Sequence, residues 1–570
     1  MPSDRPGRWR LLVLGVVLSI VWASVTVRLF DIQVVRAAEL EEQGFDQRLR
    51  SVELSPRRGT IYDHDGRVLA FTIDGSSIYA HPHEVDDVMS TALALAGVLG
   101  VPVADVEASL RSDSPFVWVE RQVEPDVGEG VLALELPGVY AVDEPMRVYP
   151  AGSSVGHVVG FVDVDGNGIE GLEYHFDAQL KGRAGFLQYE SSPSGVPILQ
   201  GQTVEVAREP GTDLVTTIDL SLNVIAEQAC ADGVERTGAK RCAVVVLDPD
   251  TGAVLSLVVT PGLDPADRST LDTDTLLARM ENMAIRSLYE PGSVMKLVTV
   301  SAALEEGVIT PEHTFEVPPF MEFEDPERPD DPWRFVDGNR NETELMTVRD
   351  IVTRSSNIGT ILIQSRLGVP SQQAYLEAFG FGAPTGIDYS GEPVGQVNVD
   401  PSCTTCGPSA AIGYAVNTTL LQMAAAFAVV ANGGEWVQPH LVGEVHGTDG
   451  VVATEPERRQ VLSEDTARTM RSLLLGVVES ERGTGRNAVV DGYLVGGKTG
   501  TSRVFDDGAY QEDRFMASFI GMAPIDDPRL VVAVLMEEPV EGYYGGQAAA
   551  PVFSEVMLKA LHALGVEPDA

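Results

Sequence analysis

Residues 289–296 read Tyr289–Glu290–Pro291–Gly292–Ser293–Val294–Met295–Lys296, and this stretch decides the fold that we expect. The proline and glycine before the serine indicate a helix start, and the residues from Val294 to Leu304 have a helical composition. On a helix, Ser293 and Lys296 lie on one face, where the amine can take the proton of the hydroxyl. Backbone N–H groups at a helix N-terminus can also stabilise an oxyanion. Alone, this motif is weak, because Ser-x-x-Lys arises by chance in many long proteins.

A second motif, Ser355–Ser356–Asn357, follows a predicted helix from Thr347 to Arg354. A hydroxyl and a carboxamide two residues apart can flank a nucleophile, one relaying a proton and the other binding a substrate amide. Taken alone, this motif is better interpreted as an ordinary helix cap.

The third motif is Lys498–Thr499–Gly500–Thr501–Ser502, at the end of the strand-like stretch Tyr493–Gly497. Glycine lets an acyl substrate lie against the strand as an added strand, and the lysine and threonines can bind its carboxylate. Taken alone, it is an edge strand that runs into a polar turn.

Lysine is scarce in this chain, and two of its five lysines fall within the motifs. They are Lys181, Lys240, Lys296, Lys498 and Lys559. Arginine stays protonated in proteins, whereas a partly buried lysine can lose its proton, so arginine cannot replace a lysine that acts as a base. The three motifs in this order are typical of penicillin-binding proteins and serine β-lactamases.

The chain resembles the penicillin-interacting serine acyltransferases over nearly its whole length. Further similarity lies in Ala411–Tyr414 and in Ala550–Phe553. Upstream, Arg58–Asp63, Arg147–Pro150 and Gly168–Glu173 resemble the pedestal signature of class B, monofunctional transpeptidases, most of all the division-specific type.

This resemblance implies an α/β fold, in which a serine β-lactamase-like transpeptidase domain has an antiparallel sheet flanked by helices. A β-rich, elongated pedestal domain and an N-terminal transmembrane helix are expected to precede it. The expected limits are a cytoplasmic tail over 1–10, an anchor over 11–34, the pedestal over 35–205 and the transpeptidase domain over 206–566. Strand-like stretches near residues 242–258 and 493–536 also suggest one sheet built from both ends of this domain.

The resemblance also implies a mechanism. Ser293 attacks the carbonyl between two terminal D-alanines of a peptidoglycan stem peptide, and Lys296 acts as general base. Backbone N–H groups of Ser293 and Thr501 hold the oxyanion. Ser355 and Asn357 assist proton transfer and substrate binding, and Lys498, Thr499, Gly500 and Thr501 form the site for the terminal carboxylate. β-Lactams are expected to acylate the same serine, and neither a metal nor a cofactor is expected.

Three other functions compete with this interpretation. A class A β-lactamase carries a Glu-x-x-Leu-Asn loop, and no such string lies between Asn357 and Lys498. A non-catalytic penicillin sensor needs a signalling domain, for which the roughly ten residues before the apolar run leave no room. A structural scaffold for the division machinery would not require both lysines.

The acidity of the chain excludes one class of partner. Eighty-four acidic residues against 40 basic ones give a net charge of −44, which argues against nucleic-acid binding. The expected partners are instead the cytoplasmic membrane, a polytopic glycan polymerase and other division proteins.

Leu11–Val27 is an apolar run preceded by Arg5, Arg8 and Arg10. It predicts a single-pass anchor in the cell membrane with its N-terminus in the cytoplasm and the catalytic domain outside. A signal peptide cleaved after Ala23 is the alternative.

Two local features complete the predictions. The four cysteines favour disulfides outside the cytoplasm, with Cys230–Cys242 and Cys403–Cys406 as natural pairs, while a four-thiolate zinc site is the alternative. The acidic, proline-rich segment Pro318–Pro332 predicts an exposed loop.

Overall fold

The computed structural model describes residues 6–37, 39–40, 49–54, 56–190, 203–324, 332–337, 342–506 and 508–569. The chain forms two compact units, one of residues 1–57 with 182–210 and one of residues 58–181 with 211–570. Each unit therefore combines segments that are distant in the sequence.

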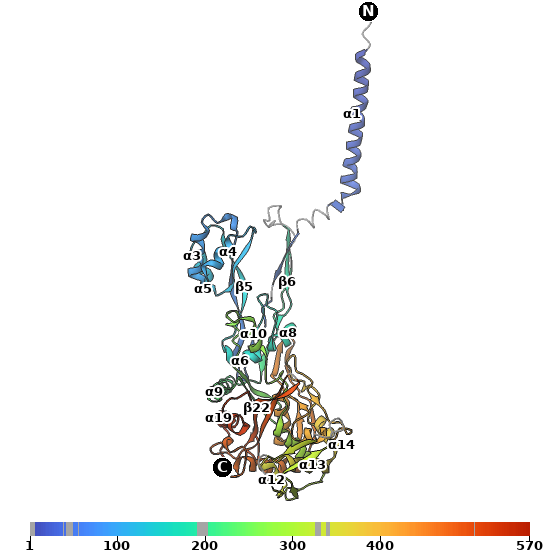
Figure 1. The fold of residues 1–570 in the computed structure, drawn as a ribbon. Coiled ribbons are helices and arrows are strands. Elements are labelled where there is room, and N and C mark those ends of the chain that lie inside the picture. Colours follow the sequence, from blue (N-terminus) through green and yellow to red (C-terminus); the bar gives the residue numbers. More distant parts are fainter. Residues whose placement is uncertain are drawn as a thin grey trace, which may run out of the picture. The chain divides into compact units, whose positions relative to one another are not determined.

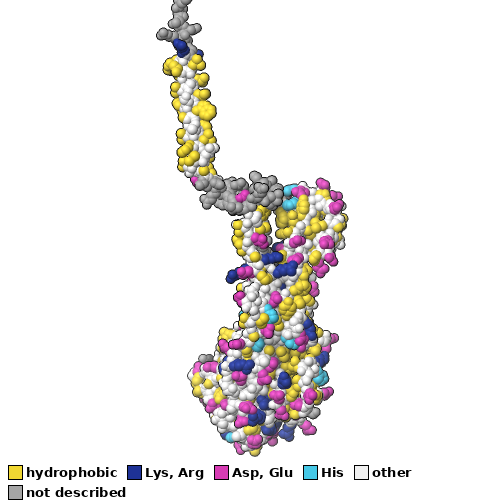
Figure 2. All heavy atoms as spheres, turned by 180° about the vertical axis from the view of Figure 1, so that it is seen from behind, with side chains coloured by type: hydrophobic (Ala, Val, Ile, Leu, Met, Phe, Trp, Pro, Cys, Tyr) yellow, Lys and Arg dark blue, Asp and Glu magenta, His cyan; other side chains and the backbone are white. Residues whose placement is uncertain are grey.

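The first unit contains helix α1 (Pro6–Phe30), which continues as a π-helical turn over Asp31–Val35. Its most apolar part has a mean hydropathy of 2.1 and is not buried, and Figure 2 shows the hydrophobic side chains along it. The helix is long and apolar enough to cross a membrane, as the sequence predicts. The unit also holds an antiparallel sheet in the order β1 (Leu49–Leu54), β6 (Gly185–Glu190) and β7 (Thr203–Val206).

The second unit begins with a small subdomain that has its own core. Strand β3 (Val68–Ala80) pairs with both β4 (Val117–Val123) and β5 (Val139–Val148). Ile78 and Ala80 point to one face of the sheet, because side chains alternate along a strand. Three helices supply the rest of this core: α3 (Val88–Leu99), α4 (Val103–Leu110) and α5 (Pro125–Leu132).

A seven-stranded sheet joins this subdomain to the C-terminal half of the chain. Strand β2 (Ile61–Tyr62) pairs with β3 and also, in parallel, with β8 (Asp213–Thr216). Strand β8 in turn pairs with β18 (Val442–Gly447), which pairs with β19 (Gly450–Ala453). This shared sheet places residues 58–181 in one compact unit with residues 211–570.

The five-stranded antiparallel sheet of the second unit uses both ends of its C-terminal part, as predicted. Its order is β10 (Val254–Thr260), β9 (Arg241–Leu247), β23 (Leu530–Glu537), β22 (Ala509–Ala523) and β21 (Gly496–Asp506). Helices α9 (Leu220–Thr237) and α19 (Ala550–Ala563) pack together on one face (Figure 1). The wholly buried α16 (Leu420–Ala431) packs on the other face. Because both faces are covered, the central strands are apolar without alternation.

The other α-helices described in the second unit are α6 (Ser153–Val159), α7 (Gly171–His175), α8 (Asp177–Lys181), α10 (Thr273–Met280), α11 (Lys296–Glu305), α12 (Val348–Thr353), α13 (Asn357–Leu367), α14 (Val369–Ala378), α15 (Cys406–Ala411), α17 (Glu464–Glu479) and α18 (Gly545–Ala548). Among the described residues, four short antiparallel pairs complete the strands: β11 (Thr314–Val317) with β14 (Glu344–Thr347), β12 (Phe320–Phe323) with β13 (Trp333–Val336), β15 (Gln396–Val397) with β16 (Val416–Asn417), and β17 (Glu435–Val437) with β20 (Arg458–Gln460).

Two local predictions have different outcomes. The prediction of a loop over Pro318–Pro332 is wrong at Phe320–Phe323, which is strand β12, while residues 325–331 lie outside the described residues. This strand is stabilised by cross-strand pairing with β13, which the local sequence does not predict. The expected disulfides Cys230–Cys242 and Cys403–Cys406 are confirmed.

Candidate active site

Ser293 lies in a short 3₁₀ turn, Gly292–Met295, directly before helix α11. The turn packs tightly against the third motif, because a Cβ on Gly292 would lie 2.9 Å from the carbonyl oxygen of Thr501. The N–H of Gly292 donates to the carbonyl of Gly413 at 3.0 Å. Gly292 has a φ of 59°, which favours glycine. The nucleophile turn is therefore held between β21 and the turn at Gly413.

The lysines of the first and third motifs meet at the second motif. The Nζ of Lys296 donates to the carbonyl of Ser355 at 2.7 Å, to its Oγ at 3.2 Å and to Asn357 Oδ1 at 2.7 Å. The Nζ of Lys498 donates to the same Ser355 Oγ at 2.9 Å and to the carbonyl of Thr499 at 3.2 Å. The fold thus brings together residues that the sequence separates widely.

Burial controls the charge of both lysines. Lys296 and Lys498 are each 1% exposed. Burial lowers the pKa of Lys296 to about 7, although the negative charge of Asp337 opposes this effect. Burial, together with the positive charge of Lys296, also lowers the pKa of Lys498 well below its usual value. A neutral amine is therefore accessible at Lys296 near neutral pH, one turn after Ser293.

Ser355 has a strained backbone between two helices. Its φ is 58°, a left-handed conformation that is unfavourable for a residue other than glycine. Helix α12 ends just before it, and Ser356 caps α13 by accepting a hydrogen bond from the N–H of Gly359 at 2.9 Å. This sharp turn presents Ser355 and Asn357 to Lys296. The sequence predicts the preceding helix but not the strain.

Thr499, Gly500 and Thr501 lie on β21, which is one of the two edge strands of the five-stranded sheet. The Thr499 hydroxyl is 2.9 Å from that of Thr484, and Thr501 Oγ1 accepts from the N–H of Gly545 at 3.0 Å. A Cβ on Gly500 would lie 2.8 Å from the carbonyl oxygen of Pro291, so packing against the nucleophile turn also requires glycine here. Among the described strands β21 pairs with β22 alone, so its other edge is suited to an added strand.

Sequence reasoning missed Asp337, which lies between β13 and the second motif. Its carboxylate accepts hydrogen bonds from the Ser356 hydroxyl, from the N–H of Asn357 and, at 3.2 Å, from that of Ile358. Asn357 Nδ2 donates to the carbonyl of Val336 at 3.1 Å. A carboxylate at the N-terminus of α13 also interacts favourably with the helix dipole. No local signal could have identified Asp337, because it is one of many carboxylates in an acidic part of the chain.

The family model described as Penicillin binding protein transpeptidase domain matches residues 242–558, which include all three motifs. The chain belongs to the penicillin-binding protein transpeptidase family. A second model, the Penicillin-binding Protein dimerisation domain, matches residues 53–216. Together the two matches identify a class B penicillin-binding protein.

The family includes similar proteins of known name and structure. Stage V sporulation protein D of Bacillus subtilis is 32% identical, covering 98% of this chain and 86% of that protein. Peptidoglycan D,D-transpeptidase FtsI of Escherichia coli is 28% identical, covering 99% and 93%. The crystal structure of penicillin-binding protein 3 from Mycobacterium tuberculosis, complexed with aztreonam, superposes with a TM-score of 0.71 at 26% identity, covering 91% and 98%.

The charge of Lys296 predicts how acylation of this penicillin-binding protein depends on pH. Below pH 7 the amine is protonated and cannot accept the Ser293 proton, so the acylation rate constant should fall about tenfold for each pH unit below that midpoint. Lys296→Arg should reduce the rate about 100-fold to 10,000-fold. Stopped-flow acylation between pH 5 and pH 9 measures both effects. A rate independent of pH over this range would contradict the assignment of Lys296 as base.

Asp337 should tune that pH dependence. Its negative charge favours the ammonium form of Lys296, so Asp337→Asn should lower the pKa of Lys296. The pH at which the acylation rate falls to half its maximum should then move to a lower value. The variant should also lose about 0.5–2 kcal/mol of stability, because α13 loses a capping carboxylate. Asp350→Asn, which removes the capping carboxylate of α12, is the matched control and should leave the pH midpoint of the acylation rate unchanged. An unchanged pH midpoint in Asp337→Asn would refute the prediction.

Proposed function

We propose that this penicillin-binding protein cross-links peptidoglycan at the division septum through an acyl-enzyme on Ser293. It is a serine-type D-Ala-D-Ala transpeptidase of cell-wall synthesis, in keeping with its similarity to peptidoglycan D,D-transpeptidase FtsI. One observation supports the residue roles most strongly. The buried amine of Lys296, whose pKa is about 7, follows Ser293 by one turn and contacts Ser355 and Asn357.

Acylation begins when Ser293 Oγ attacks the carbonyl carbon between the two terminal D-alanines. Lys296 Nζ takes the hydroxyl proton as the new C–O bond forms. The N–H groups of Ser293 and Thr501 stabilise the oxyanion, and the close packing of Gly292 on Thr501 supports this role. The C–N bond then breaks, and the proton passes from Lys296 through Ser355 to the amine of the departing D-alanine.

Lys498 is placed to bind the terminal carboxylate of the stem peptide together with Thr499 and Thr501. Burial disfavours its ammonium form when the site is empty. A carboxylate that binds beside it reverses this preference, because an opposite charge raises the pKa of an amine. Substrate binding should therefore be coupled to proton uptake at Lys498, which also orients the Ser355 hydroxyl that it contacts.

The acyl group is then transferred to an amine of a neighbouring stem peptide. Lys296, again neutral, takes the proton of this amine as it attacks the ester carbonyl, and Ser293 recovers its proton as leaving group. A β-lactam acylates Ser293 in the same way, but its leaving amine remains covalently linked to the acyl group after the ring opens and does not leave the site. The acceptor amine is then kept away, which accounts for a long-lived adduct.

The remaining parts of the chain suit an enzyme anchored in the membrane. We propose a cytoplasmic tail over 1–10, a membrane anchor over 11–34, a pedestal over 35–205 and the transpeptidase domain over 206–566. Arg8 and Arg10 precede the apolar part of α1, which favours a cytoplasmic N-terminus and a catalytic domain outside. Two disulfides fit that oxidising side of the membrane. We further propose a polytopic glycan polymerase and other division proteins as partners.

Covalent labelling with fluorescent penicillin tests the proposed nucleophile. The full chain in detergent should give a stable fluorescent band, and Ser293→Ala should abolish it. Ser301→Ala is the matched control, because Ser301 is a buried serine of α11 outside the motifs and should leave labelling intact. Loss of the label over hours would agree with a transpeptidase, whereas loss within seconds would indicate a β-lactamase. A folded parent that takes no label would refute the proposed function.

A further inference from the structure

The segment that leads into the nucleophile has little secondary structure to hold it. Residues 281–291, all of which the structure describes, contain neither a helix nor a strand. One isolated β-bridge joins Tyr289 to Thr418. Side-chain contacts therefore add to a few backbone hydrogen bonds, such as those between Tyr289 and Thr418, in holding the segment before Ser293, and Arg286 lies near its middle.

Arg286 connects this segment to residue Glu170 of the N-terminal region. Its Nη1 donates to Glu170 Oε1 at 3.0 Å, and its Nη2 lies 2.9 Å from Glu170 Oε2. Nε and Nη2 also donate to the carbonyl of Ser390 at 3.1 and 2.9 Å, and the guanidinium lies 5.3 Å from the ring centroid of Tyr389. Three of its five N–H groups thus donate to two partners, and the ion pair with Glu170 adds a further contact, so the side chain has little freedom.

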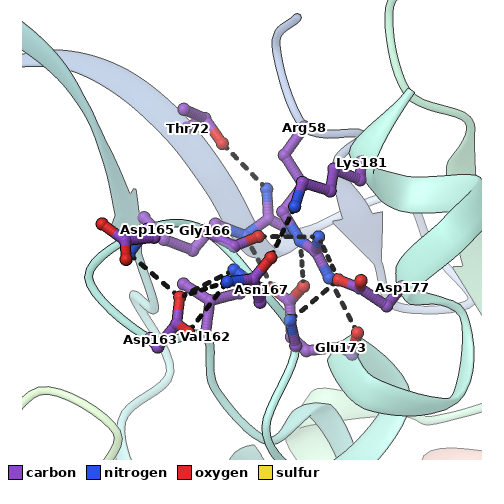
Figure 3. A network of polar contacts seen from close by, with 12 residues as sticks. Arg58, Thr72, Val162, Asp163, Asp165, Gly166, Asn167, Glu173, Asp177 and Lys181 are labelled. Carbon is purple, nitrogen blue, oxygen red and sulfur yellow. Dashed lines mark hydrogen bonds and ion pairs between the residues drawn. The ribbon is translucent and has the colours of Figure 1, made fainter. Parts of the chain in front are cut away.

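Glu170 is itself held rigidly, because it immediately precedes helix α7. A Cβ on Gly160 would lie 1.8 Å from the carbonyl oxygen of Glu170, so the two backbones are in close contact. Within α7, the carboxylate of Glu173 is fully buried and binds Arg58 at 2.5 Å and Arg147 at 2.7 Å. Figure 3 shows Arg58 surrounded by Glu173, Asp177 and the carbonyl of Gly166. The buried ion pairs of Glu173 therefore fix α7, and Glu170 directly precedes this helix.

Two further contacts connect the same parts of the molecule. His175, at the end of α7, has its Nδ1 3.1 Å from Ser390 Oγ. The Tyr389 hydroxyl donates to the carbonyl of His157 at 2.8 Å, and Asn282 Nδ2 donates to the same carbonyl at 3.2 Å. Helices α6 and α7 thus contact the nucleophile segment and residues 389–390 at several points.

We propose that Arg286 and Glu170 are positioning residues for acylation, which hold the segment before Ser293 so that its hydroxyl faces Lys296 and the N–H of Thr501. Neither residue belongs to the three motifs proposed to bind the substrate. The proposal rests on the proposed acylation of Ser293 and adds that residues 160–173 contribute to the rate of that reaction. A small displacement of a reacting atom lowers a rate strongly, so the effect should appear in the chemical step and not in the initial binding of the β-lactam.

The test is the kinetics of acylation of the full chain by a fluorescent penicillin, resolved into a binding constant and a first-order acylation rate constant. Glu170→Gln keeps the shape of the side chain but removes its charge. Arg286→Lys keeps the charge but cannot reach Glu170 and Ser390 together. Each variant should lower the acylation rate constant about tenfold with little change in the binding constant. The double variant should lose little more than either single variant, because both remove the same interaction.

Arg121→Lys is the matched control, because Arg121 forms an ion pair with Glu144 in the N-terminal region that also holds Glu170. The side chains of Arg121 and Glu144 are 24% and 19% exposed, and those of Arg286 and Glu170 are 23% and 15% exposed. The control should leave the acylation rate constant unchanged. If Arg286→Lys does not fold, Glu170→Asp replaces it, because the shorter side chain breaks the contact without adding bulk. A loss below about threefold in the Glu170 variants, or an equal loss in the control, overturns the proposal. An unlabelled parent would instead refute the proposed function.

Discussion

The amines of Lys296 and Lys498 both donate to the hydroxyl of Ser355, and both side chains are almost completely buried. Each buried ammonium costs several kcal/mol of solvation, and two of them so close together also repel each other. The molecule relieves this cost by releasing a proton, and the pKa of Lys296, three residues after Ser293, falls to about 7. Two of the five lysines in a chain of net charge −44 thus lie where a cation can become neutral.

That arrangement requires a closely packed surrounding. Gly292, Gly413 and Gly500 allow the nucleophile turn, the turn at 413 and β21 to approach to backbone contact. Asp337 orders the start of α13 and supplies the nearby negative charge that moderates the pKa of Lys296. Helices on both faces of the five-stranded sheet hold β21 in a fixed position, while its outer edge can still pair with a substrate.

The region before the transpeptidase domain is more than a spacer in this structure. Strands β2 and β8 join it to the C-terminal half through one sheet, and α7 connects its buried arginine network to Arg286. Arginine suits these contacts because its planar guanidinium binds a carboxylate and a carbonyl at the same time. The buried cations of these two regions therefore differ in use: arginine forms the fixed ion pairs around α7, and lysine lies among the three motifs.

The sequence by itself determined the features that depend on near neighbours. The helix start at Ser293 and the apolar strands near residues 242–258 and 493–536 were predictable, because helix starts and buried strands leave local patterns. The short cysteine spacings favoured the two disulfides that form but left a zinc site open. The order of the motifs also indicated the family. Only the tertiary structure decided the contact of both lysines with Ser355, the strain at Ser355, and the positions of Asp337 and the Glu170–Arg286 pair. These contacts join residues that are 19 or more positions apart, and the geometry of such contacts arises from packing, which no local pattern records.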